Sequence, residues 1–150
     1  MNNKWPIYAE DEIAVATEIL RSGKVNYWTG EHGKLFEKEY ADYLGMPYTV
    51  AVSNGTVAIE LCLRALDIGA GDEVIVPAKT FIATASAVVA MGAKPVIADV
   101  DINSHNITAE TIAPHINPKT KAIVVVHLSG YPCDMKSILA LAKKNNLFVI

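Results

Sequence analysis

The sequence predicts an α/β domain in which helices cover a mostly parallel sheet. Apolar runs typical of strands alternate with helical patterns along almost all of the 150 residues, and the connections between them are short. Residues 122–126 (AIVVV) form an unbroken apolar run. Such a run is typical of a parallel strand buried on both faces, because crossover helices pack on either side of a parallel sheet.

The helices are predicted from apolar residues that recur at helical spacing. The first places Ile13, Ala16 and Ile19 on one face and ends at Gly23, because glycine readily adopts the left-handed conformation that closes a helix. Asp134 is a suitable N-cap for the last helix. The predicted helices are residues 9–22, 34–44, 56–66, 80–91, 108–113 and 134–144.

The strands are predicted from short runs of β-branched and apolar residues between turn signals. They are residues 48–52, 73–76, 95–100, 121–127 and 147–150. In an open α/β sheet the functional loops follow the carboxyl ends of the strands. We therefore expect any site to lie at that edge.

Composition narrows the class of protein. The net charge of −3 argues against a broad nucleic-acid-binding surface. Two cysteines are too few for a disulfide framework, and Cys62 is predicted to be a small core residue. The histidine spacings match no metal site, and the sequence has neither a signal peptide nor an apolar run long enough to span a membrane. We expect a soluble cytoplasmic protein without a metal.

The strongest local signal for binding is the segment 51–58 (AVSNGTVA), where a predicted strand, a small polar turn and a helix follow one another. Free backbone amides at a helix start attract anions. Gly55 lets the backbone approach a ligand closely, and Thr56 adds a hydroxyl. A plain N-cap is the alternative, and on this motif alone it is the simpler interpretation.

Other candidates follow later strands. Phe81 comes just after a strand end, where its ring could stack on a planar cofactor, although a core role is the ordinary interpretation. Lys79 is interpreted as a solvated loop lysine rather than a nucleophile. His127 ends the most apolar strand, a position where function is plausible. Dinucleotide and P-loop motifs are absent.

Taken in order, several segments resemble the DegT/DnrJ/EryC1/StrS family of sugar aminotransferases. The likeness covers nearly the whole chain and includes several motifs in register. The segments are residues 30–37 (GEHGKLFE), 51–58, 71–77 (GDEVIVP), 80–85 (TFIATA), 92–96 (GAKPV) and 127–135 (HLSGYPCDM).

The resemblance implies a fold-type-I aminotransferase, a homodimer with pyridoxal 5'-phosphate (PLP) as cofactor. It assigns Gly55 and Thr56 to the cofactor phosphate and Phe81 to the pyridine ring, and it suggests that residues 26–30 lie near the substrate. The chain, residues 1–150, would be the N-terminal part of the PLP-binding large domain, truncated before the second domain. The expected reaction moves an amino group from an amino acid, with glutamate as the expected donor, to a keto group of a nucleotide-linked sugar, for polysaccharide, glycan or antibiotic sugar biosynthesis.

In this family the acidic partner of the pyridine nitrogen and the Schiff-base lysine follow the strand that corresponds to residues 147–150. We therefore expect no catalytic residue in this segment and no transamination by the 150-residue chain alone. Two alternatives stay open. One is a PLP-dependent deoxysugar dehydratase of the same superfamily, in which histidine replaces that lysine; the other is a non-catalytic module that binds phosphate or a nucleotide sugar.

Overall fold

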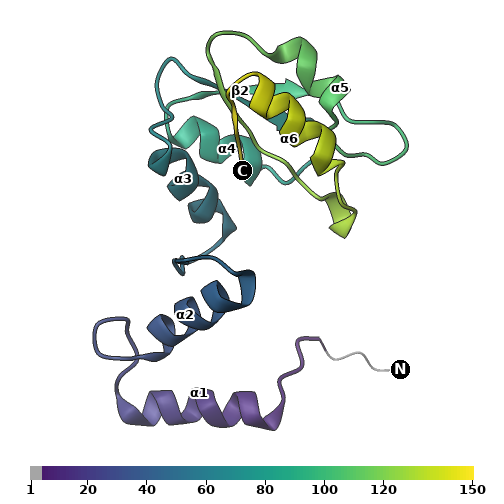
Figure 1. The fold of residues 1–150 in the computed structure, drawn as a ribbon. Coiled ribbons are helices and arrows are strands. Elements are labelled where there is room, and N and C mark those ends of the chain that lie inside the picture. The colour runs from purple at the N-terminus through teal and green to yellow at the C-terminus, as the bar shows by residue number, and fades with distance from the viewer. Residues whose placement is uncertain (1–4) are drawn as a thin grey trace. The chain divides into compact units, whose positions relative to one another are not determined.

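The computed structural model describes residues 5–150. They fall into two compact units, Met1–Ala51 and Val52–Ile150, which are described separately. Figure 1 traces both units from the N-terminal helices to the C-terminal strand. Within the described residues, no helix is both long and apolar enough to cross a membrane.

The N-terminal unit contains two helices, α1 (Glu10–Ser22) and α2 (His32–Leu44). Each ends at a glycine with positive φ, Gly23 at 68° and Gly45 at 65°, and the first of these is the helix stop predicted from the sequence. Among residues 5–51, only Gly30 and Ala41 are buried. Apolar side chains of both helices are therefore exposed within this unit.

The second unit is the predicted α/β domain. Four parallel strands form a sheet in the order β2-β1-β3-β4, and Ile75 of the central strand β1 pairs with Val96 of β2 and Ile123 of β3. The elements of this unit are α3 (Gly55–Ala65), β1 (Glu73–Pro77), α4 (Ala83–Ala90), β2 (Lys94–Ala98), α5 (Ala109–Ile112), η1 (Ala113–His115), β3 (Thr120–Ile123), η2 (Leu128–Gly130), α6 (Met135–Lys144) and β4 (Phe148–Val149).

Helices cover both faces of this sheet because its central strands are apolar on both sides. Val74 and Val76 pack in a cluster that includes Leu63 of α3 and Val88 of α4. The residue between them, Ile75, packs instead in a cluster with residues of α5 and α6. Figure 1 shows α3 and α4 side by side, as their mutual packing requires. The α/β prediction is thus confirmed.

Three details differ from the sequence predictions. Residues 48–52 form no strand; a strand needs a hydrogen-bonded partner, and β propensity alone does not supply one. The strand predicted over residues 121–127 is Thr120–Ile123, and beyond it Val124 N–H still donates to Ile75 O and Val125 N–H to Ile150 O. Cys62 is exposed rather than buried, whereas Cys133 is buried, because Cys62 lies on a different face of α3 from the buried Leu63.

Candidate functional site

The predicted anion-binding turn lies at the start of α3. Asn54 is the N-cap, and its Oδ1 accepts a hydrogen bond of 3.0 Å from the backbone N–H of Val57. The N-cap interpretation is therefore correct, but it satisfies only one of the free donors at a helix start. Within the described chain, the amides of Gly55 and Thr56 make no recorded hydrogen bond.

The space in front of this turn is open. A Cβ built on Gly55 would meet no atom within 4 Å, and Ser53, Asn54 and Gly55 are all exposed. Two unsatisfied amides at the positive end of an eleven-residue helix can bind an anion such as a phosphate. The geometry thus fits the group that the resemblance assigns to Gly55 and Thr56.

Phe81 follows strand β1, as predicted, but it lies in the loop before α4 rather than in the helix predicted over residues 80–91, because α4 begins only at Ala83. Its side chain is 75% exposed, so it is not the core residue that a lone phenylalanine would usually be. The loop is held at both ends: Ala78 N–H donates to Ala98 O at 2.8 Å, and the Thr80 and Thr84 hydroxyls are 2.8 Å apart. The ring therefore stands free on an anchored loop.

The sequence did not show how α3 and the Phe81 loop are related in space. Phe81 lies two residues before α4, and α4 packs against α3. The turn at the start of α3 and the Phe81 loop therefore lie in the same unit, and each directly precedes one of two helices that contact each other. Their joint use in binding remains a prediction.

Lys79 is exposed but not free. Its Nζ lies 2.7 Å from Nδ1 of His105, a residue in the loop after β2. A lysine ammonium can only donate, so Nδ1 accepts and the ring proton of a neutral His105 is on Nε2. The contact joins the loops that follow β1 and β2. The sequence indicated a solvated Lys79 and did not show this pair.

His127 follows β3 and is exposed, with its ring orientation fixed by the backbone. The N–H of Cys133 donates to its Nδ1 at 3.1 Å, which leaves the proton of a neutral ring on Nε2. The Cys133 thiol donates to Val126 O at 3.2 Å, and burial raises its pKa. His127 is thus an oriented donor whose target is not assigned.

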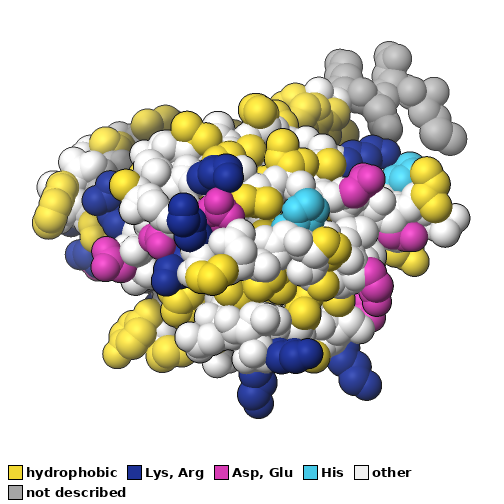
Figure 2. Space-filling view, turned by 90° about the horizontal axis from the view of Figure 1, so that it is seen from above, with side chains coloured by type: hydrophobic (Ala, Val, Ile, Leu, Met, Phe, Trp, Pro, Cys, Tyr) yellow, Lys and Arg dark blue, Asp and Glu magenta, His cyan; other side chains and the backbone are white. Residues whose placement is uncertain are grey.

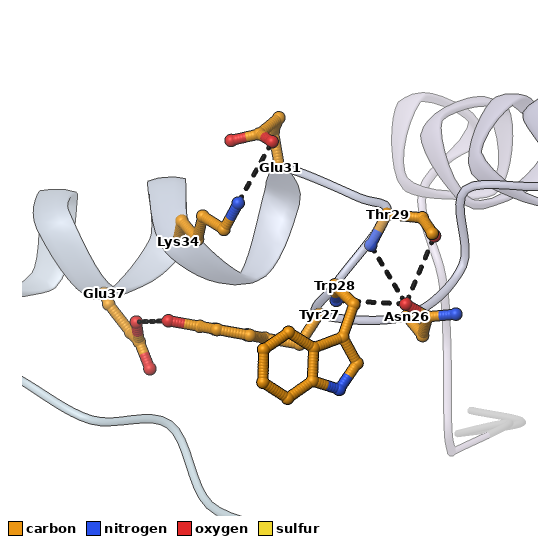
Figure 3. Close-up of polar contacts among 7 residues, drawn as sticks. All are labelled: Asn26, Tyr27, Trp28, Thr29, Glu31, Lys34 and Glu37. Atoms are coloured by element: carbon orange, nitrogen blue, oxygen red, sulfur yellow. Dashed lines mark hydrogen bonds and ion pairs between the residues drawn. The ribbon is translucent and has the colours of Figure 1, made fainter.

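In the N-terminal unit, residues 26–30 form a tight loop (Figure 3). Oδ1 of Asn26 accepts three hydrogen bonds, from the amides of Trp28 and Thr29 and from the Thr29 hydroxyl. The Trp28 indole is exposed and meets the Tyr27 ring edge-on. That residues 26–30 lie near the substrate stays a prediction.

Glu37 of α2 anchors this loop and was not singled out in the sequence. One carboxylate oxygen accepts from the Tyr27 hydroxyl at 3.0 Å, and the other accepts from the Ala51 amide at 2.8 Å. The hydrogen bond to this carboxylate and its negative charge raise the pKa of Tyr27. Lys34 lies over the Tyr27 ring, 6.0 Å from its centroid.

The charged side chains do not separate into large regions of one sign on the face drawn in Figure 2, where basic and acidic groups alternate with apolar ones. This agrees with the small net charge. Among the described residues there is no group of three or more histidine, cysteine, aspartate or glutamate side chains that could hold a metal ion.

The parallel sheet, the helices on both of its faces and the open start of α3 define an α/β protein of the fold-type-I aminotransferase kind. An aminotransferase from Psychrobacter cryohalolentis superimposes with a TM-score of 0.93 at 52% identity, over 97% of this chain and 37% of its own. A sugar aminotransferase from Streptococcus pneumoniae, solved in a PLP form, superimposes with a TM-score of 0.87 at 37% identity, over 95% of this chain and 36% of its own.

Residues 6–150 match the profile of the DegT/DnrJ/EryC1/StrS aminotransferase family, and the chain belongs to that family. Among curated relatives, the dTDP-3-amino-3,6-dideoxy-alpha-D-galactopyranose transaminase of Aneurinibacillus thermoaerophilus is 46% identical over 95% of this chain and 39% of its own length. The chain thus spans about two fifths of the length of the curated relative it matches.

Proposed function

We propose that the protein takes part in PLP-dependent transfer of an amino group to a keto group of a nucleotide-linked sugar. Family membership over residues 6–150 supports the reaction class. The observation that connects the proposal to particular residues is the open start of α3, where the Gly55 and Thr56 amides make no hydrogen bond within the described chain and a Cβ at Gly55 would meet no atom within 4 Å. In this proposal, residues 1–150 are the N-terminal part of the PLP-binding large domain.

The residues present fit the cofactor. The amides of Gly55 and Thr56, with the dipole of α3, would hold the phosphate, and the exposed ring of Phe81 would pack on the pyridine ring. The chemistry that PLP supplies when bound is an electron sink for the bonds at the substrate's amine carbon. The protein's own share in this segment is to bind and orient, and we assign no catalytic residue here.

The finer features of the proposal rest on the family. They are glutamate as the amino donor, a homodimer as the working form, the cytoplasm as its location, and inactivity of the 150-residue chain by itself. The dehydratase of the same superfamily and the phosphate-binding or nucleotide-sugar-binding module are the competing functions. Assaying the full-length protein, of which residues 1–150 are the proposed N-terminal part, with PLP, glutamate and a panel of keto-sugar nucleotides separates the aminotransferase from both, since only it forms an amino sugar.

Cofactor binding can be tested on the chain itself. Titration of the ¹⁵N-labelled chain with PLP, pyridoxal and inorganic phosphate should shift the Gly55 and Thr56 amide signals with PLP and phosphate, and much less with pyridoxal. Phe81→Ala should weaken binding of PLP but not of inorganic phosphate, because phosphate has no ring to stack on.

Ile82→Ala is the matched control, since Ile82 is the adjacent side chain and is 71% exposed. It should leave PLP binding unchanged. Equal losses in the two variants would remove Phe81 from the site. Unshifted Gly55 and Thr56 signals at saturating PLP would remove the turn as well.

A further inference from the structure

Lys79 and His105 connect the loop that carries Phe81 to the loop after β2. The Nζ of Lys79 lies 2.7 Å from Nδ1 of His105, and Lys79 is two residues before Phe81. The other two anchors of this loop are a backbone hydrogen bond at Ala78 and a hydroxyl pair at Thr80. Neither of these contains a group that titrates near neutral pH. Of the three anchors, the contact of Lys79 with His105 is therefore the one that can respond to pH.

The backbone of His105 is held in place on both sides. Its N–H donates to Asp101 O at 2.8 Å, and Asp101 N–H donates to Asn106 O at 2.9 Å. Asn106 is 3% exposed. Its Nδ2 donates to Tyr131 O at 2.8 Å, and its Oδ1 accepts from Leu128 N–H at 3.2 Å. The imidazole ring therefore projects from a loop that is tied to the segment after β3, and it can restrain a neighbouring side chain.

The contact with Lys79 needs a neutral histidine ring. Nδ1 accepts from the ammonium only while it carries no proton, because a protonated imidazole has donors at both nitrogens. A positive charge on the ring would also repel the ammonium at this distance. Histidine is the residue type that changes charge between pH 5 and pH 8. We therefore expect the contact to hold at pH 8 and to break as the pH falls toward 5.

The titratable groups around the His105 ring come from three loops. Lys79 follows β1 and contacts the ring directly, while Asp101, from the loop after β2, and Tyr131, after η2, line the same hollow of about 550 Å³ as His105. Hydrogen bonds from the amide and the hydroxyl of Ser104 lower the pKa of Asp101. Its carboxylate therefore stays negative over this pH range, and the charges of Lys79 and Asp101 oppose each other at the ring.

We propose that His105, acting through Lys79, is a positioning residue for the Phe81 loop, and that protonation of His105 releases this anchor. This role rests on the proposed function, in which the Phe81 ring packs on the pyridine ring of the cofactor. A loop with one restraint fewer must be ordered when the ligand binds, and that ordering lowers affinity. Inorganic phosphate, which has no ring to stack on, should bind independently of His105.

Three variants test this role. His105→Asn keeps an acceptor where Nδ1 lies, does not titrate, and suits the left-handed backbone at this position, φ 59°. Lys79→Met keeps the length of the side chain but removes the ammonium, so the anchor is absent at every pH. Lys24→Met is the matched control, because Lys24 is also exposed and belongs to the other unit.

The first measurement needs no cofactor. In the ¹⁵N-labelled chain, the amide signals of Thr80, Phe81 and Ile82 should move between pH 8 and pH 5 along the titration curve of the His105 ring. They should move in the same way in Lys24→Met and stay in place in His105→Asn. In Lys79→Met the ring still titrates but holds no anchor, so this variant separates release of the loop from the electric field of a charged ring.

The second measurement compares binding of pyridoxine 5'-phosphate with binding of inorganic phosphate. This compound has the ring and the phosphate of the cofactor but no aldehyde, so it forms no Schiff base with lysines. At pH 8, Lys79→Met should bind it roughly threefold more weakly than the native chain does, as expected for an exposed contact, and His105→Asn should bind it as well as the native chain. Toward pH 5 the native chain should become weaker than His105→Asn, and the ratio of the two affinities cancels the titration of the ligand itself.

Failure of this role and failure of the proposed function give different results. If the Gly55 and Thr56 signals do not respond to pyridoxine 5'-phosphate, the proposed cofactor site is wrong, and the pH titration of the Phe81 loop still decides whether His105 anchors it. The role of His105 is overturned if the loop signals follow the same pH curve in the native chain and in Lys79→Met. It is also overturned if His105→Asn binds the ligand as weakly at pH 8 as Lys79→Met does.

Discussion

Asn106 shows how much one side chain can contribute to stability. The nitrogen and the oxygen of its side-chain amide each form a hydrogen bond with the backbone of another loop. Asn106→Ala would leave the Leu128 N–H and the Tyr131 carbonyl without their partner. An unsatisfied group of this kind costs about 1–3 kcal/mol. We expect a loss of about 2 kcal/mol in the free energy of unfolding, measured by urea denaturation.

Asn103→Ala provides the comparison, since Asn103 is exposed and lies in the same loop. Its effect should stay within about 0.5 kcal/mol, as for most surface substitutions. Similar losses in the two variants would show that Asn106 does not connect the loops.

Glu73 makes stability depend on pH. Its carboxylate accepts from Asn117 Nδ2 at 2.7 Å and from Lys94 Nζ at 3.0 Å, and these contacts lower the pKa of Glu73. A lowered pKa in the folded state adds stability above the ordinary glutamate pKa, and this stability is lost as the pH falls through the lowered value. Thermal unfolding from neutral to acidic pH should therefore show a steeper loss for the native chain than for Glu73→Gln. Parallel curves would contradict this assignment.

The role of a residue could be predicted from the sequence only where it depends on neighbouring residues in the chain. The turn at Gly55 could be predicted because a helix start creates free amides wherever it occurs. Asn106 could not, because its partners, Leu128 and Tyr131, are more than 20 residues away in sequence. The position of Phe81 after a strand was correct, but its exposure needed the fold. The binding roles of Gly55, Thr56 and Phe81 stay predictions.

At the scale of the element, helix α3 combines a structural cap with a proposed binding turn, and the two roles can be separated. Asn54→Ala removes the acceptor of the Val57 amide and should cost about 1 kcal/mol of stability. Asn54→Asp should keep that stability, because aspartate caps a helix equally well. Its negative charge, however, should weaken phosphate binding at Gly55 and Thr56.

Urea denaturation measures the first effect, and titration with inorganic phosphate measures the second. Equal phosphate affinity in the native chain and in Asn54→Asp, at low ionic strength, would argue against an anion at this turn. The alanine variant keeps the free amides and should bind phosphate nearly as well as the native chain wherever it is folded.

Helices were predicted more accurately than strands, for a physical reason. A helix satisfies its own backbone, so apolar spacing and the stops at Gly23 and Gly45 were enough to place α1 and α2 within two residues. A strand exists only where a neighbour pairs with it. Residues 48–52 have suitable side chains but form no strand, and β3 ends at Ile123, short of the predicted residue 127.

At the scale of the whole chain, buried area is distributed unevenly between the units. The core residues Ile75 and Ile123 are fully buried in the second unit, whereas only Gly30 and Ala41 are buried among residues 5–51. Protection of backbone amides from hydrogen exchange depends on the local free energy of opening, which rises with buried apolar contact. We therefore expect the amides of β1 and β3 to exchange with solvent most slowly, and those of α1 most rapidly among the regular elements.

Native-state hydrogen exchange followed by NMR measures this order directly. Ile75→Val removes one buried methylene group and should lower the opening free energy of β1 and β3 amides by about 1 kcal/mol. Ile13→Val, at an exposed position of α1, should leave the same amides unchanged. Because the second unit carries the proposed cofactor residues, its rigidity is what would hold the α3 turn and the Phe81 loop in place. Protection of α1 as strong as that of β1 would instead mean that the exposed apolar side chains of α1 are covered in solution.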